Sequence, residues 1–125
     1  MWEYFSTDEL KCRGTDECDM NEDFMNKLVS LRKEFNEPMV ISSGYRHLSY
    51  NQVIGGAKSS PHIYGKAVDV LVSGKAAYRL IKLSMDHGFT GIGVSQKGPH
   101  EGRFLHLDTM ENTNIHPRPW IWSYK

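Results

Sequence analysis

Hydrophobic side chains recur at helical intervals in two stretches of the chain. In residues 21–35 they are spaced three and four apart, which places them on one face of an α-helix. These residues are Phe24, Leu28, Leu31 and Phe35. Residues 75–87 have the same period and end before Gly88, a residue type that commonly follows a helix. Its inward positions are expected to be Ala76, Leu80, Ile81 and Leu83. Two amphipathic helices that pack on a core are therefore predicted.

Short apolar runs between these stretches are typical of strands. Pro38 ends helical geometry before the apolar residues 39–41, and residues 67–72 are rich in β-branched side chains. Two further strands are expected near residues 91–94 and 103–107. The loops and helices between them separate the strands irregularly.

Short helical segments and a loop are expected between the strands. Ser6 and Glu9 have the spacing of a capping box, which predicts a short helical turn. Residues 49–54 are expected to form a brief helix, and residues 42–46 the loop after the first strand. Strands mixed with helices in this order favour an α+β fold, with helices on a small and largely antiparallel sheet.

Length and charge limit the classes of protein to consider. A chain of 125 residues suits one domain around one core. Fifteen basic and fifteen acidic side chains cancel, so no net field attracts nucleic acid or an anionic membrane. No apolar run approaches the ~20 residues that span a bilayer, and no signal-peptide pattern is found. We expect a single domain over residues 1–125, a monomer made in the cytoplasm without an export signal, with no nucleic-acid binding or membrane insertion.

Two cysteines, Cys12 and Cys18, lie in an acidic loop. Their spacing fits neither a redox pair nor a zinc knuckle. Free thiols are the favoured interpretation, with a local disulfide or a metal role as alternatives.

Two short segments carry the side chains of a candidate metal site. One contains His62 and Asp69, and the other contains His106 and Asp108. Two imidazoles and one carboxylate suit a catalytic zinc ion, which keeps its fourth position open, whereas four ligands close a structural zinc site. Such a set also serves iron(II) in oxygenases, and the surrounding residues here favour zinc. Because side chains alternate along a strand, His106 and Asp108 are expected on one face. Asp108 either orients a ligand histidine or is an ordinary polar residue at a strand end.

These segments and their neighbours resemble the zinc D-Ala-D-Ala carboxypeptidase family, which includes phage endolysins and shares its fold with the amino-terminal domain of hedgehog proteins. The resemblance covers residues 40–110, in the order Ser43-Gly44-Tyr45-Arg46, Asn51, Ile54-Gly55-Gly56-Ala57, Ser60-x-His62-x-x-Gly65-x-Ala67-x-Asp69, Gly91-Ile92-Gly93 and His106-x-Asp108. It implies a hedgehog/DD-peptidase-like fold and a zinc peptidase that acts on cell-wall peptides containing D-amino acids. The implied zinc ligands are His62, Asp69 and His106.

The resemblance also implies roles for residues near the metal. Arg46 matches an arginine that contacts substrate and stabilises charge on the carbonyl oxygen, a task that suits a permanently charged planar fork of donors. A surface ion pair is the alternative. Ser60 either binds the substrate carboxylate or caps a turn. Tyr64, like Tyr45, either lines the cleft and contacts substrate or belongs to the scaffold.

The general base is where the chain departs from the family pattern. Better characterised members carry an acidic residue three positions before the last histidine ligand, where this chain has Arg103. A positioned base contributes typically about 10²–10⁴-fold. Glu101 is the first candidate to replace it and His100 the second, against a solvated loop with no catalytic role. Arg103 either reinforces the anion site or pairs with a surface carboxylate.

The carboxyl-terminal segment, residues 116–124, is aromatic. A strand or extended segment that packs Trp120 and Trp122 on the body is the favoured interpretation. A cleft wall that stacks on sugar rings or peptide is the alternative.

The sequence thus predicts hydrolysis of an amide bond in peptidoglycan stem peptides or cross-links, by a carboxypeptidase or an endolysin-type endopeptidase. Zinc as cofactor lowers the pKa of its bound water to about 7, so no serine or cysteine nucleophile is needed. A phage or prophage lysin that reaches the wall after release fits the missing signal peptide. Two alternatives on the same fold are a non-catalytic zinc module that binds a partner, which Arg103 supports, and a virion structural protein.

Overall fold

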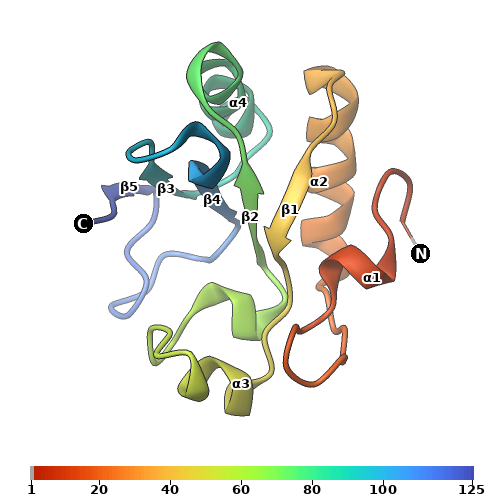
Figure 1. Ribbon diagram of the computed structural model, residues 1–125, viewed down its shortest axis with the longest axis vertical. Coiled ribbons are helices and arrows are strands. Elements are labelled where there is room, and N and C mark those ends of the chain that lie inside the picture. The colour runs from red at the N-terminus through yellow and green to blue at the C-terminus, as the bar shows by residue number, and fades with distance from the viewer. Residues whose placement is uncertain (1) are drawn as a thin grey trace.

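The computed structural model describes residues 2–125 and contains one mixed sheet with the strand order β1-β2-β4-β3-β5 (Figure 1). Its strands are β1 (Val40–Ser43), β2 (Ala67–Leu71), β3 (Gly91–Ser95), β4 (Phe104–Asp108) and β5 (Trp120–Ser123). Neighbouring strands pair antiparallel, apart from the parallel pair β3 and β5. The predicted α+β fold with a largely antiparallel sheet is confirmed.

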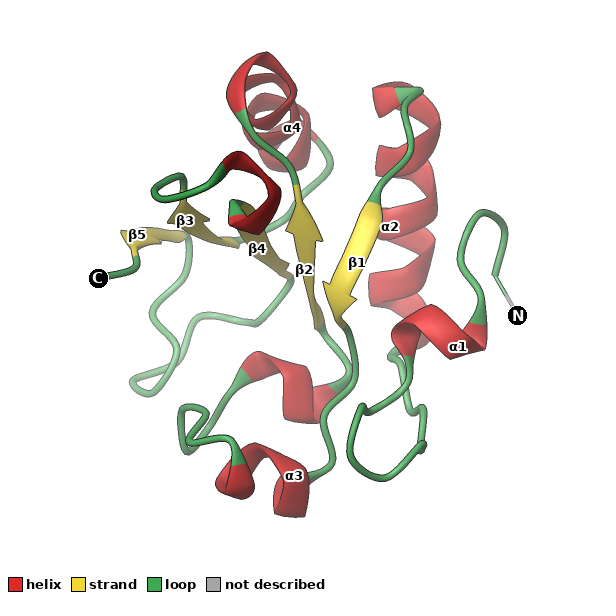
Figure 2. Cartoon of the chain, in the orientation of Figure 1, coloured by secondary structure: helices red, strands yellow, loops and turns green. Residues whose placement is uncertain are grey.

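Two longer helices and several short ones surround this sheet. They are α1 (Thr7–Leu10), α2 (Glu22–Phe35), α3 (Leu48–Val53) and α4 (Gly74–Asp86), with 3₁₀ turns η1 (Pro61–Tyr64) and η2 (His100–Gly102). In Figure 2, α2 and α4 lie beside the upper part of the sheet and α3 lies below it. The capping box of Ser6 and Glu9 opens α1 as predicted, and Gly88, with φ of 83°, follows α4. The hydrophobic period therefore identified both long helices.

Strands β2 and β4 separate the core from the polar face of the sheet. Val68 and Val70 of β2 and Leu105 and Leu107 of β4 are buried in one cluster with α2 and α4. Each buried aliphatic side chain of this kind contributes roughly 1.5–3 kcal/mol, and a one-residue slip in register would expose all of them. The core thus fixes which side chains point to the opposite face.

The structure corrects two details of the predicted elements. Ser42 and Ser43 belong to β1 rather than to a loop, and Ser43 pairs with Asp69. The apolar pattern missed them because β1 is an edge strand, which does not need two buried faces. In α4, Ala77 is fully buried while Ala76 and Ile81 are only partly buried, so the buried stripe begins one position later than expected.

Two further expectations concern the state of the cysteines and the possibility of a membrane-spanning helix. Cys12 is buried and Cys18 half-buried, and both are free thiols. The sulfur of Cys12 accepts a hydrogen bond from the backbone N–H of His47. Within residues 2–125, every helix is too short or too polar to cross a bilayer.

Candidate metal centre

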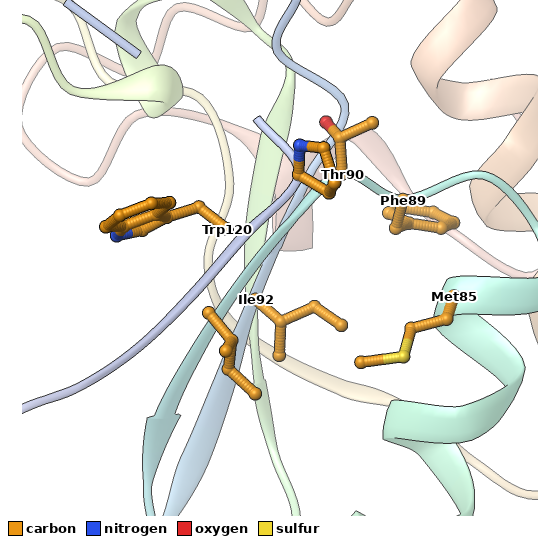
Figure 3. A pocket seen from close by; sticks show the side chains of 7 residues that line it. Met85, Phe89, Thr90, Ile92 and Trp120 are labelled. Atoms are coloured by element: carbon orange, nitrogen blue, oxygen red, sulfur yellow. The ribbon is translucent and has the colours of Figure 1, made fainter. Parts of the chain in front are cut away.

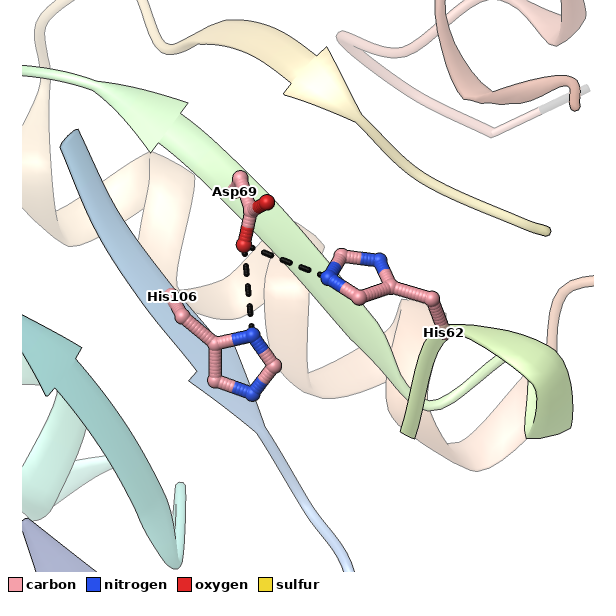
Figure 4. A group of neighbouring side chains, drawn as sticks. All are labelled: His62, Asp69 and His106. Carbon is pink, nitrogen blue, oxygen red and sulfur yellow. Dashed lines mark hydrogen bonds and ion pairs between the residues drawn. The ribbon is translucent and has the colours of Figure 1, made fainter. Parts of the chain in front are cut away.

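Strand pairing and one tight turn bring three candidate ligands together (Figure 4). Asp69 of β2 and His106 of β4 are directly opposite in the antiparallel register. His62 lies in η1, and Gly65, with φ of 68°, turns the chain from η1 into β2. A side chain at residue 65 would meet the backbone of Asp19, so glycine is required both for conformation and for space.

The three ligand atoms converge on one point. His62 Nε2 and His106 Nδ1 each lie 3.2 Å from Asp69 Oδ1. One ligand atom from each residue lies within 4.8 Å of the others, and all three residues are buried. The structure therefore assembles the three residues that the sequence predicted as zinc ligands.

The opposite nitrogen of each ring is occupied, which orients both histidines. His62 Nδ1 donates to the carbonyl oxygen of Gly44 at 2.8 Å, and His106 Nε2 donates to Asp108 Oδ2 at 2.7 Å. With those protons placed by the bonding network, the lone pairs of both rings face the Asp69 carboxylate. Three electron-rich atoms meet without a donor of their own, so the donor set fits a cation.

Burial and hydrogen bonding set the charges of these groups. Burial lowers the pKa of His62, which favours the neutral ring that binds metals. Burial opposes charge on Asp69, but the close approach of His106 and His62, each able to take up a proton, outweighs it and lowers the pKa of that carboxyl. Burial also opposes charge on His106, but the neighbouring carboxylates of Asp108 and Asp69 outweigh it and raise its pKa. A proton and a metal ion therefore compete for His106.

Asp108 occupies the orienting position behind His106. Its carboxylate is 0% exposed and accepts hydrogen bonds from His106 Nε2 and from Arg118 Nε and Nη2. Burial raises the pKa of this carboxyl, but those hydrogen bonds outweigh it and hold the pKa at about 2. Of the two alternatives for Asp108, the structure favours a partner of the candidate ligand over a simple strand-end residue.

A cleft of about 460 Å³ opens over the three candidate ligands. Arg46 lines it with Nη2 3.8 Å from Asp69 Oδ2, and Ser43 and Asn51 hold the guanidinium in place. Ser60 also lines the cleft, and its hydroxyl accepts the backbone N–H of His62 at 3.3 Å. The capping role and a position facing the cleft therefore coexist at Ser60.

Three other predicted site residues lie outside the cleft lining. Tyr64 is 51% exposed and packs its ring against His116. Glu101 and His100 are exposed on η2. Arg103 adopts neither of its expected roles, because its Nε donates to the backbone carbonyl of Gly98 at 3.0 Å. His100, Glu101 and Arg103 are therefore not among the residues that line the cleft.

Aromatic side chains from the end of the chain build one wall of the cleft. Trp122 and Tyr124 line it together with Phe104 of β4, and the centres of the Trp122 and His106 rings lie 5.1 Å apart. The tail forms strand β5 as expected, but its rings are not buried in the body, since Trp120 is 55% exposed and Trp122 faces the cleft. β5 is an edge strand that pairs only with β3 within the described sheet, so its rings have fewer neighbouring side chains than those of an interior strand.

Sequence reasoning placed Trp122 and Tyr124 at the cleft only through the alternative interpretation of the aromatic tail, and it missed Arg118 as part of the site. One signal in the sequence could have indicated these residues. Gly91 and Gly93 alternate within a predicted strand, and glycine inside a strand often marks a site where another group approaches the backbone closely. A side chain at Gly91 would meet the Asp108 carboxylate, and one at Gly93 would lie 2.7 Å from the Trp122 indole nitrogen. The two glycines make room on β3 for the groups that surround His106.

A second pocket, of about 390 Å³, lies between α4 and strands β3 and β5 (Figure 3). Its lining is apolar apart from Thr90, whose hydroxyl donates to the carbonyl of Met110. This pocket lacks ligand or acid–base groups among the described residues, so the candidate chemistry belongs to the cleft over Asp69.

An open set of two histidines and one aspartate on an α+β sheet is typical of metal-dependent hydrolases. The comparisons with known proteins agree. The chain belongs to the peptidase M15 family, whose model matches residues 3–108. It is also 33% identical over 69 residues to the zinc D-Ala-D-Ala carboxypeptidase of Streptomyces albus G. That alignment covers 54% of this chain and only 27% of the Streptomyces protein.

Proposed function

We propose that the chain is a zinc-dependent peptidase that hydrolyses peptidoglycan peptide bonds involving D-amino acids. The observation that carries the proposal is the convergence of His62 Nε2, Asp69 Oδ1 and His106 Nδ1 under a cleft, in a member of a peptidase family. The Streptomyces relative is a zinc D-Ala-D-Ala carboxypeptidase, which supports both the metal and the class of substrate.

His62, Asp69 and His106 would hold the ion. Zinc, when bound, supplies a Lewis acid that polarises a scissile carbonyl and acidifies water. The backbone of Gly44 and the carboxylate of Asp108 keep both rings in the orientation that presents a lone pair to the ion.

Arg46 is the residue that we assign to substrate charge. Among the described residues that line the cleft, Arg46 is the one cationic side chain other than the two candidate ligand histidines. Ser43 and Asn51 hold its guanidinium in place. A fixed guanidinium stabilises a carbonyl oxygen that gains negative charge, or binds a terminal carboxylate. Ser60, which also lines the cleft, would add a hydroxyl to that contact.

Glu101 is our candidate for the group that takes and returns a proton, with His100 as the alternative. Both lie on η2, immediately before β4, which carries His106. The turn begins after Gly98, whose φ is 73°, and Glu101 is free of hydrogen bonds within the described residues. A rotation of this exposed turn toward the cleft would bring the base to the substrate.

Digestion of purified muropeptides, followed by mass spectrometry, tests the proposal. The zinc-loaded protein should release new fragments whose masses identify the bond, and none should form after chelation or with His62→Ala. Arg79→Gln, a change in α4 at a contact with the end of α2 and outside the cleft lining, serves as the matched active control. Intact muropeptides from a folded, zinc-replete sample would contradict the proposal.

The fragment masses also separate the finer alternatives. Loss of a terminal D-alanine indicates a carboxypeptidase, whereas cleavage within stem peptides or cross-links indicates an endolysin-type endopeptidase. We favour a monomeric phage or prophage lysin that acts on the wall after release, and lysis of cell walls from outside is the matching assay.

A non-catalytic zinc module is the second candidate, and one observation favours it. Asp69 is the lone carboxylate among the described residues that line the cleft, and the candidate base Glu101 is outside it. Such a module would bind zinc with the same ligands and leave muropeptides uncut. A virion structural protein on this fold would likewise leave them uncut and would assemble tightly with other chains.

A further inference from the structure

The segment between β4 and β5, residues 109–119, contacts the metal centre through Arg118. Its guanidinium forms a fork on the buried Asp108 carboxylate, with Nε 3.0 Å from Oδ1 and Nη2 2.8 Å from Oδ2. The Arg118 side chain is 6% exposed and that of Asp108 is 0% exposed. A bidentate pair removed from water is the strong and geometrically specific form of this contact.

Asp108 in turn holds the ring of His106. The same Oδ2 that accepts from Arg118 accepts His106 Nε2–H at 2.7 Å, and this bond leaves Nδ1 facing Asp69. Without Arg118, the buried Asp108 carboxylate would keep only the hydrogen bonds from His106 Nε2 and from the backbone N–H of Met110, and the fork that fixes its orientation would be gone. The acceptor that orients the ring of His106 would then be held less firmly.

Other contacts hold the same segment against the site. The Arg118 guanidinium lies over the Trp122 ring, with its central carbon 5.3 Å from the ring centre, and Trp122 packs beside His106. His116 Nε2 donates to the carbonyl of Ser59, three residues before His62. The segment thus contacts the surroundings of both ligand histidines, although it lies beyond residues 3–108 that the family model matches.

We propose that Arg118 is a positioning residue of the metal centre. It fixes the orientation of the Asp108 carboxylate, which in turn orients His106 Nδ1 toward the metal. This inference rests on the proposed metal site and adds the carboxyl-terminal segment to it. Arg118 does not line the cleft, so it acts through Asp108 rather than on substrate.

Metal affinity and the spectrum of the bound metal test this role. Cobalt(II), which reports ligand geometry in its visible absorption, is titrated into wild type, Arg118→Gln and Arg118→Lys, and zinc affinity is measured by competition with a chelator. Loss of a partner that orients a ligand costs about 10–100-fold in metal affinity. We expect a loss of that order for Arg118→Gln, with an altered cobalt spectrum, and a smaller loss for Arg118→Lys, which keeps the charge without the fork.

Arg79→Gln is the matched control, because Arg79 also makes several hydrogen bonds, to Glu34, Phe35 and Glu37, away from the site. It should lower stability without changing the cobalt spectrum. Wild-type affinity and spectrum in folded Arg118→Gln would overturn the inference. If Arg118→Gln does not fold, unchanged values in Arg118→Lys would overturn it instead. Failure of the wild-type protein to bind either metal would contradict the proposed function itself.

Discussion

The two histidines offer different nitrogens to the same carboxylate oxygen. His62 presents Nε2 because Gly44 accepts its Nδ1–H, and His106 presents Nδ1 because Asp108 accepts its Nε2–H. A ring that loses such an acceptor can rotate or change tautomer. The chemistry of the site therefore depends on a backbone carbonyl and on a buried carboxylate as much as on the ligands.

Glu101 is the residue whose proposed role is easiest to separate from metal binding. We expect Glu101→Gln to keep its zinc and lose about 10²–10⁴-fold in turnover, because the amide cannot accept a proton. Turnover of muropeptides and zinc content are measured on the same sample. Glu111→Gln, another exposed change, should behave like wild type. Full turnover in Glu101→Gln would move the assignment to His100, for which His100→Asn is the corresponding variant.

Among the elements, β3 shows how a strand shapes a site without supplying a ligand. Gly91 and Gly93 are paired with Asp108 and His106 of β4, and with Trp120 and Trp122 of β5. Because these glycines lack side chains, Asp108 and the Trp122 ring lie over the strand itself.

Gly91→Ala tests this close approach. The new methyl group would meet the Asp108 carboxylate, which Arg118 and His106 hold in place, so the strand must move. We expect a destabilisation of roughly 1–3 kcal/mol, typical of overpacking, together with weaker zinc binding. Urea unfolding and zinc competition measure the two effects. Gly102→Ala is the control, because a side chain there meets no atom within 4 Å. Equal stability and zinc affinity in both variants would show that Asp108 is not confined by β3.

For the molecule as a whole, the site joins elements far apart in the chain. η1 supplies His62, β2 supplies Asp69 and β4 supplies His106. The carboxyl-terminal segment contacts Ser59 and Asp108, which lie beside these ligands. A metal that binds all three ligands therefore links these elements. We propose that residues 1–125 unfold as one cooperative zinc peptidase domain.

Removal of the metal should lower the thermal stability of this domain. A ligand that binds only the folded state stabilises it by about 2.7 kcal/mol at a free concentration of 100 times Kd. Chelation of the zinc-loaded protein should thus lower Tm by several degrees in a single transition, as followed by circular dichroism. His62→Ala should show no change in Tm on addition of zinc or chelator. A Tm of the wild-type protein that ignores zinc would contradict a metal site in the folded core.

Local patterns predicted much of this structure. The helical period located α2 and α4, and the two segments rich in His and Asp, together with their resemblance to a zinc peptidase family, indicated the candidate ligands His62, Asp69 and His106. Alternation along β4 placed Leu105 and Leu107 in the core and His106 on the opposite face. These features depend on residues close in sequence or on a motif of fixed order.

What the sequence did not predict depends on contacts between distant residues. Arg118 reaches Asp108 only because the loop after β4 returns to the sheet, and no local period marks that contact. Trp122 faces the cleft because β5 pairs in parallel with β3, whereas a strand pattern alone does not fix its partner. The conformation of the Gln96–Arg103 loop, which decides where Glu101 points, is likewise set by tertiary contacts, such as those of Gln96 with Val72 and Phe104.

The ligand set is best tested by anomalous diffraction at the zinc absorption edge, from crystals of the zinc-loaded protein. We predict one strong peak bound by His62 Nε2, an Asp69 carboxylate oxygen and His106 Nδ1, with a coordination position open to the cleft. A peak held by other residues, or a fourth protein ligand that closes the site, would contradict a catalytic zinc centre at Asp69.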